Sequence, residues 1–150
     1  MALTKVSRGL LSTGIVDNSN ATAITIGSDE SVTFATGADI ITASAGTSNV
    51  RVGVNAGNSI ASGGNFNTVV GDEAGTAINT GDKNVFVGYA AGDATTSSVN
   101  NVAIGTEALT TNILGSSSVA IGTGALAVQN PASAVSMLNV AVGQDAGVNI

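Results

Sequence analysis

The sequence predicts an all-β protein built from stacked repeats, a parallel β-helix or β-roll with coils of about 17 residues. Three observations predict it: a motif recurs six times, large side chains are scarce, and the connectors are rich in turn-forming residues. The 150-residue chain is 43% hydrophobic, yet only 3% aromatic and 9% charged. Such a composition argues against disorder, and it leaves too few bulky side chains for a thick core.

The motif has the consensus N-V-x-[VI]-G-x-x-A-[GL], in which x is variable. It covers residues 49–57, 67–75, 84–92, 101–109, 118–126 and 139–147. Its glycines, separated by 18, 17, 17, 17 and 21 residues, are Gly53, Gly71, Gly88, Gly105, Gly122 and Gly143. Units this short cannot bury an apolar face alone, so the regular spacing predicts coils that stack on one another.

Each part of the unit has a physical interpretation. The V-x-[VI] triplet alternates with the period of a β-strand, so its two β-branched side chains share one face. The following glycine is expected to turn the chain, and the alanine three residues later suits the inside of a tight corner. A second, weaker strand in each coil is expected around the apolar connector residues Ile60, Ile78, Ile113 and Val128.

The asparagine that opens the motif predicts a ladder along the stack. Identical amides in successive coils, about 4.8 Å apart, can hydrogen-bond up and down it. The ladder positions are Asn49, Asn67, Asn84, Asn101 and Asn139. Ser118 stands in place of asparagine in the fifth repeat and is expected to weaken the ladder there.

The middle residue of the triplet points away from the β-branched pair. Phe86 in this position is expected to fill a gap between strands, with an exposed aromatic contact surface as the alternative. Arg51 is expected to be solvated or paired with an acid of a neighbouring chain.

A single chain with coils this narrow buries little apolar surface. The sequence therefore favours a homotrimer on a shared axis, where three Val/Ile faces meet, over a monomeric solenoid.

The composition also bears on function. The chain has no Cys and no His, which excludes disulfides, thiolate zinc sites and the commonest general base. The acidic residues that follow the motif glycines are interpreted as turn residues with solvent-exposed side chains. The net charge of −6 argues against binding to nucleic acid, and no apolar run approaches the roughly 20 residues of a membrane-spanning helix. We therefore expect no enzymatic activity, cofactor, metal or membrane insertion.

The first 45 residues differ from the repeats. Residues 23–34 predict a strand, a turn and a second strand, and no secretory signal is expected at the start of the chain. We divide the chain into an N-terminal capping or anchoring module, residues 1–45, and a repeat shaft, residues 46–150. The candidate anchoring residues are Lys5, Arg8, Leu10 and Leu11.

The repeats resemble those in the heads of trimeric autotransporter adhesins, which are left-handed parallel β-rolls of three chains, and equally those of bacteriophage tail fibres. The opening residues, 1–34, resemble the start of virion proteins from marine and cyanobacterial phages. An autotransporter needs a secretion signal and a membrane anchor, whereas a phage protein is released by lysis, so the phage interpretation is favoured.

The resulting hypothesis is a phage tail-fibre protein, assembled in the host cytoplasm and present in the virion. Its expected partners are itself, other virion proteins through the N-terminal segment, and a glycan or protein of the host surface. The alternatives are a head decoration or head fibre, a fragment of a bacterial trimeric adhesin, and a solenoidal ice- or carbohydrate-binding module.

Overall fold

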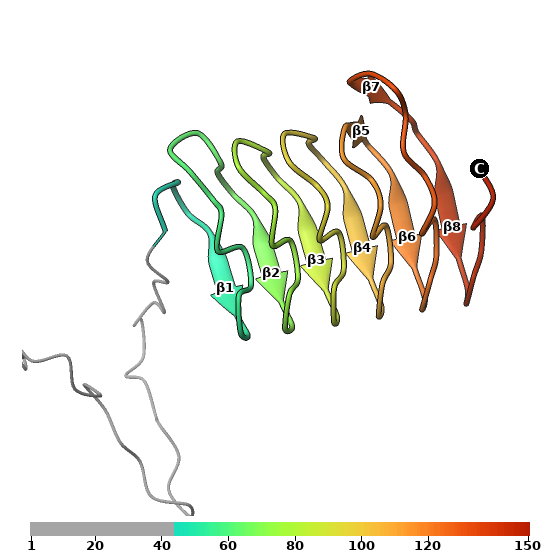
Figure 1. Ribbon diagram of the computed structural model, residues 1–150, viewed down its shortest axis with the longest axis horizontal. Coiled ribbons are helices and arrows are strands. Elements are labelled where there is room, and N and C mark those ends of the chain that lie inside the picture. Colours follow the sequence, from blue (N-terminus) through green and yellow to red (C-terminus); the bar gives the residue numbers. More distant parts are fainter. Residues whose placement is uncertain (1–43) are drawn as a thin grey trace, which may run out of the picture. The chain divides into compact units, whose positions relative to one another are not determined.

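The computed structural model describes residues 44–150. Over this range the chain is a parallel β-solenoid without any helix (Figure 1), so the predicted fold class is confirmed. The candidate anchoring residues and the residues 23–34 fall outside the described part.

Six strands form one parallel sheet in the order β1-β2-β3-β4-β6-β8. They are β1 (Val50–Val52), β2 (Thr68–Val70), β3 (Val85–Val87), β4 (Val102–Ile104), β6 (Val119–Ile121) and β8 (Val140–Val142). Each is the V-x-[VI] triplet of one repeat, with Thr68 in place of the first valine in β2, and the register pairs equivalent residues, as Val69 with Phe86. We number the coils 1 to 6 after these strands.

A second sheet has two short parallel strands, β5 (Gly115–Ser116) and β7 (Val135–Ser136). The prediction of a second strand in every coil is therefore wrong for the first coils. Ile60 and Ile78 are buried outside strands, whereas Ile113 and Val128 are exposed. In the later coils, the buried residues equivalent to Ile60 and Ile78 are Thr95, Asn112 and Gln129. Ile113 and Val128 are next to the last two in sequence and therefore lie outside the inward position.

The core is a narrow column inside the coils. The middle residue of each strand and the motif alanine point inward, and from coil 2 to coil 5 both are completely buried. The residue after the motif alanine also points inward. These inward residues are small in most coils, which explains how so few bulky side chains suffice for a closed core.

Two inward positions complement one another in volume. Phe86 is followed six residues later by Gly92, whereas Ala103 is followed by Leu109. A Cβ atom at Gly92 would lie 2.6 Å from the Phe86 ring, so each coil has room for one large side chain at this pair of positions. Ala120 with Leu126 repeats the second arrangement.

The longest coil-to-coil spacing, 21 residues, separates Gly122 from Gly143. The additional residues lie in the connector between β6 and β8, which contains β7 and projects beyond the other connectors in Figure 1. The sheet register continues unchanged across this coil, with Ala120 opposite Ala141. Extra length is therefore accommodated away from the sheet.

Candidate functional site

The outer face of the six-stranded sheet is a regular apolar feature that runs over all six strands. Since the middle residue of each strand points inward, the two flanking residues point outward. We call these twelve side chains the β-branched face: Val50, Val52, Thr68, Val70, Val85, Val87, Val102, Ile104, Val119, Ile121, Val140 and Val142. Eleven are aliphatic, one is threonine and none is charged.

The β-branched face is open to solvent in the single chain. Six of its members are half-buried and six are exposed, the latter from 36% at Ile121 to 73% at Val140. Soluble monomers rarely expose a contiguous apolar surface of this kind, and such surfaces usually mark an interaction site. The face is therefore the part of the described chain best suited to contact another molecule.

The motif asparagines form a buried ladder directly before the strands of the sheet. The side-chain Oδ1 of Asn67 accepts a hydrogen bond from the backbone N–H of Asn84 at 2.9 Å, and Oδ1 of Asn84 accepts one from Asn101 at 3.0 Å. The Nδ2 of Asn84 donates to the carbonyl of Ser98 at 3.0 Å. Most ladder bonds thus join a side-chain amide to the backbone, and one, from Nδ2 of Asn84 to Oδ1 of Asn67 at 3.1 Å, joins two amides as the sequence predicts.

Ser118 interrupts this ladder, and Gln129 occupies the space. The Ser118 backbone N–H still donates to Oδ1 of Asn101 at 3.0 Å, but its hydroxyl donates to Oε1 of Gln129 at 3.2 Å. The same Oε1 accepts from Nδ2 of Asn139 at 2.8 Å. Gln129 therefore bridges the two positions. Within residues 44–150, every buried side-chain nitrogen or oxygen has a hydrogen-bond partner.

Replacing Asn84 with alanine is expected to reduce the free energy of unfolding by about 2–3 kcal/mol. The change leaves the N–H of Asn101 and the carbonyl of Ser98 buried without these partners, and each lost partner costs about 1–3 kcal/mol. Urea denaturation would measure the loss. The matched control is Asn79→Ala, at an exposed connector position, and an equal loss in both variants would contradict a special role for the ladder.

The motif glycines line the turn that follows the sheet. They have φ values between 125° and 134°, a region that side chains disfavour. From coil 1 to coil 5, a Cβ atom on this glycine would also collide with the backbone of the next coil. The motif glycines and the asparagine ladder therefore stabilise the geometry of the coils, through contacts that lie within the solenoid.

The structure resolves the two alternatives for Phe86, which is completely buried and fills the interior of coil 3. Arg51, at the equivalent position of coil 1, is half-buried, and its Nε donates to the backbone carbonyl of Ala56 at 2.7 Å. Of the two expectations for Arg51, solvation is therefore only partial, because the inward strand position directs its side chain to the coil itself. Pairing with an acid of a neighbouring chain stays a prediction.

The acidic residues near the turns make structural contacts. An Oδ1 of Asp72 accepts from the N–H of Val54 at 2.9 Å, and an Oε1 of Glu73 accepts from Nδ2 of Asn55 at 2.8 Å. Between residues 44 and 150 there is no group of three or more acidic side chains placed to hold a metal ion. These acids connect neighbouring coils rather than converge on a ligand.

Comparisons with family models, curated proteins and solved structures find no match to the chain. Among residues 44–150, no helix is long and apolar enough to cross a membrane. The class of protein is therefore defined by the fold alone: a β-solenoid of short repeats with an aliphatic outer sheet face.

The sequence analysis correctly predicted that the β-branched residues share one face, but it missed two features of the structure. It did not separate the outward face from the inward core, and it missed the complementary volumes at Phe86 and Gly92. The second could have been found from the motif, because leucine appears at its last position only when the middle strand residue is alanine.

Proposed function

We propose that the chain is a non-enzymatic structural protein of a bacteriophage virion, in which the solenoid forms a homotrimeric fibre segment. The observation that carries the proposal is the β-branched face, a continuous uncharged aliphatic surface along the full sheet. Three copies with these faces directed to a common axis would remove them from water, and burial of apolar surface is the main driving force for such association.

The distribution of charge supports this arrangement. The described acidic side chains and the exposed Lys83 lie outside the β-branched face, on turns and connectors. A trimer would therefore bring no like charges together at its axis. Three copies at −6 each would carry −18, which favours solubility of the assembled rod.

The trimer is tested by light scattering on the full chain, with an expected mass of three times 14.4 kDa. Val87→Lys places a charge in the centre of the β-branched face, and we expect it to yield a folded species of 14.4 kDa. The matched control is Ser97→Lys on an exposed connector, which should remain trimeric. A wild-type mass of one chain, or a Val87→Lys variant of unchanged mass, would contradict the trimer.

The virion role is tested by mass spectrometry of particles purified from the source phage. We expect the chain in the particles, and we expect its loss from them when residues 1–34 are deleted while the trimer persists. Absence of the intact chain from the particles would reject the virion role. Incorporation without residues 1–34 would reject their assignment as the anchor.

A further inference from the structure

Lys83 lies at the edge of the β-branched face where the chain enters the sheet. It is exposed, it stands two residues before β3, and it is the one lysine among residues 44–150. Its ammonium group makes no hydrogen bond or ion pair with this part of the chain. The neighbouring Asp82 accepts instead from the backbone N–H of Asn65, at 2.6 Å. Within the described residues Lys83 is therefore a cation without a partner.

An acidic residue, Glu107, borders the opposite edge, where the chain leaves the sheet. It is exposed, it follows β4 by three residues, and its carboxylate has no hydrogen-bond partner between residues 44 and 150. Glu73, at the same turn position of coil 2, already accepts from Nδ2 of Asn55 at 2.8 Å. Tyr89, which is 55% exposed, lies at this edge in coil 3. The two edges are roughly 20 Å apart across the sheet, so Lys83 and Glu107 of one chain do not meet.

We propose that Lys83 of each chain pairs with Glu107 of the neighbouring chain in the trimer. This inference rests on the proposed association of the β-branched faces. When three parallel chains surround a common axis, the entering edge of one sheet lies beside the leaving edge of the next. Each Lys83 then faces Tyr89 at its own level and Glu107 one coil further along. That step is about 4.8 Å, which the long lysine side chain spans.

The pairing requires that the chains run parallel. In an antiparallel pair of sheets, two entering edges would lie together, and Lys83 would face the row of residues that directly precedes the ladder positions. That row contains no acid and consists of Ser48, Phe66, Lys83, Asn100, Ser117 and Leu138. Only the parallel arrangement brings the lysine of one copy to the free carboxylate of another. The chain thus carries both halves of the contact, at matching levels of opposite edges, which favours a second copy as the partner.

Thr68 supports the same alignment. It is the one polar member of the β-branched face, it is half-buried, and its hydroxyl has no partner within residues 44–150. Parallel chains in register bring three Thr68 side chains to one level at the axis, where each hydroxyl can donate to the next and accept from the previous one. A shifted or antiparallel chain would place valine or isoleucine opposite Thr68. The hydroxyl would then be buried without a partner, which costs stability.

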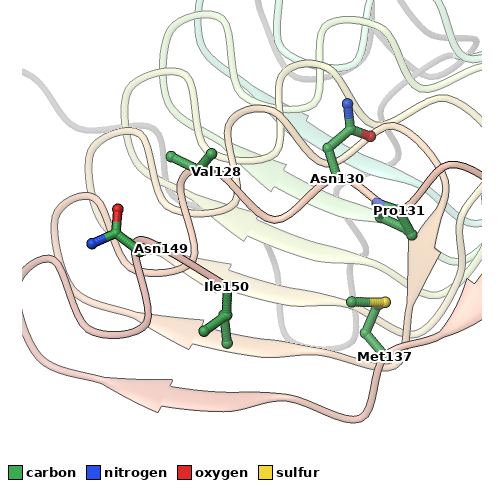
Figure 2. A pocket seen from close by; sticks show the side chains of 6 residues that line it. All are labelled: Val128, Asn130, Pro131, Met137, Asn149 and Ile150. Atoms are coloured by element: carbon green, nitrogen blue, oxygen red, sulfur yellow. The ribbon is translucent and has the colours of Figure 1, made fainter.

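The proposed contact lies in the middle of the solenoid, because coils 3 and 4 have two coils on either side (Figure 1). It is separate from a cavity of about 470 Å³ near coil 6. The side chains that line this cavity, shown in Figure 2, come from the β6–β8 connector and the last two residues, and none of them is charged. The cavity therefore offers no acid that could compete for Lys83.

The first test reverses the two charges one at a time. Both residues have positive φ, 57° at Lys83 and 56° at Glu107, so each position already holds the backbone conformation that its new residue requires. Lys83→Glu and Glu107→Lys should each raise the concentration at which half of the trimer dissociates at least about tenfold at low salt, because three contacts change from attraction to repulsion. Sedimentation velocity over a dilution series measures this concentration. Glu107→Lys reduces the net charge of a chain from −6 to −4, so general repulsion between chains would predict the opposite effect.

Mixing the two variants shows whether the pair joins different chains. An equimolar mixture should associate more tightly than either variant alone, because every contact between unlike chains again joins opposite charges. The double variant Lys83→Glu/Glu107→Lys keeps the net charge of −6 and should restore the wild-type association. The matched control is Asp145→Lys, at the same turn position of coil 6, where Leu138 takes the place of Lys83. It should stay within about twofold of the wild type.

The second test is cross-linking across the contact. The full chain has no cysteine, so Lys83→Cys/Glu107→Cys introduces one thiol at each edge. A short bis-maleimide reagent should join each chain to both of its neighbours and give a covalent trimer. Neither single variant should be cross-linked, because positions of the same kind lie on different sides of the three-fold axis.

The expected result is tighter association of the mixture together with a covalent trimer. Wild-type association of both charge-reversed variants, or cross-linking of Lys83→Cys alone, would overturn the pair while the wild-type trimer stands. A wild-type mass of one chain would reject the trimer and this inference with it. A two-chain species that shows the same rescue on mixing would reject the trimer but support the pair.

Discussion

Replacing Phe86 with alanine is expected to reduce the free energy of unfolding by about 3–5 kcal/mol. Phe86 is the largest completely buried side chain described, and its ring fills coil 3 next to Gly92. Gly92→Leu alone is expected to be at least as destabilising, because its Cβ atom would lie 2.6 Å from two atoms of the ring. Equilibrium denaturation in urea measures both losses.

The double variant Phe86→Ala/Gly92→Leu is expected to recover most of this stability. It converts coil 3 to the arrangement of coil 4, where Ala103 is followed by Leu109. Leu109 is buried with a φ of 58°, so leucine adopts the backbone conformation that Gly92 has at 57°. We expect a coupling of about 3 kcal/mol in the double-mutant cycle. Additive losses would show that the two positions do not share one volume.

Replacing Gly88 with alanine is expected to destabilise the chain by about 4 kcal/mol. The residue has a φ of 134°, and a Cβ atom would lie 2.6 Å from the carbonyl oxygen of Gly105 in the next coil. Both the backbone strain and the collision contribute, at about 1–3 kcal/mol each. The backbone of the next coil cannot move away without breaking the parallel ladder.

Gly143→Ala is the matched control for this prediction. Its φ of 125° gives a similar strain, but its Cβ atom would make only an ordinary contact, with the Cβ of Ala146 at 3.9 Å. We expect a loss of about 1–2 kcal/mol, measured by denaturation at a protein concentration too low for self-association. If both variants lost the same free energy of unfolding, the positive φ alone, and not the contact between coils, would explain why this position requires glycine.

The repeat made the fold predictable, because six copies of one motif define strand, turn and coil length together. The alternation of V-x-[VI] placed the β-branched residues on one face, as the structure shows. Alternation alone does not say which face is inward. In this chain the face with smaller residues is inward, because the coil is too narrow to hold two large branched side chains from every strand.

The connectors were less predictable than the motifs. Ile113 and Val128 are apolar but exposed, while their neighbours Asn112 and Gln129 are buried. The buried amides are stabilised by partners distant in sequence, such as the bond from Nε2 of Gln129 to Oδ1 of Asn112 at 3.3 Å. A single connector gives no sign of these partners, since they come into contact only when the coils stack.

The direction of the hydrogen bonds between coils has a mechanical consequence. The ladder bonds run from one coil to the next, roughly along the stacking direction. A pulling force along that direction therefore loads successive coils in series, and the weakest coil opens first. Each coil that opens would release about 17 residues, or roughly 55–60 Å of extended chain. Under tension such a rod would lengthen in steps and absorb work instead of breaking at once.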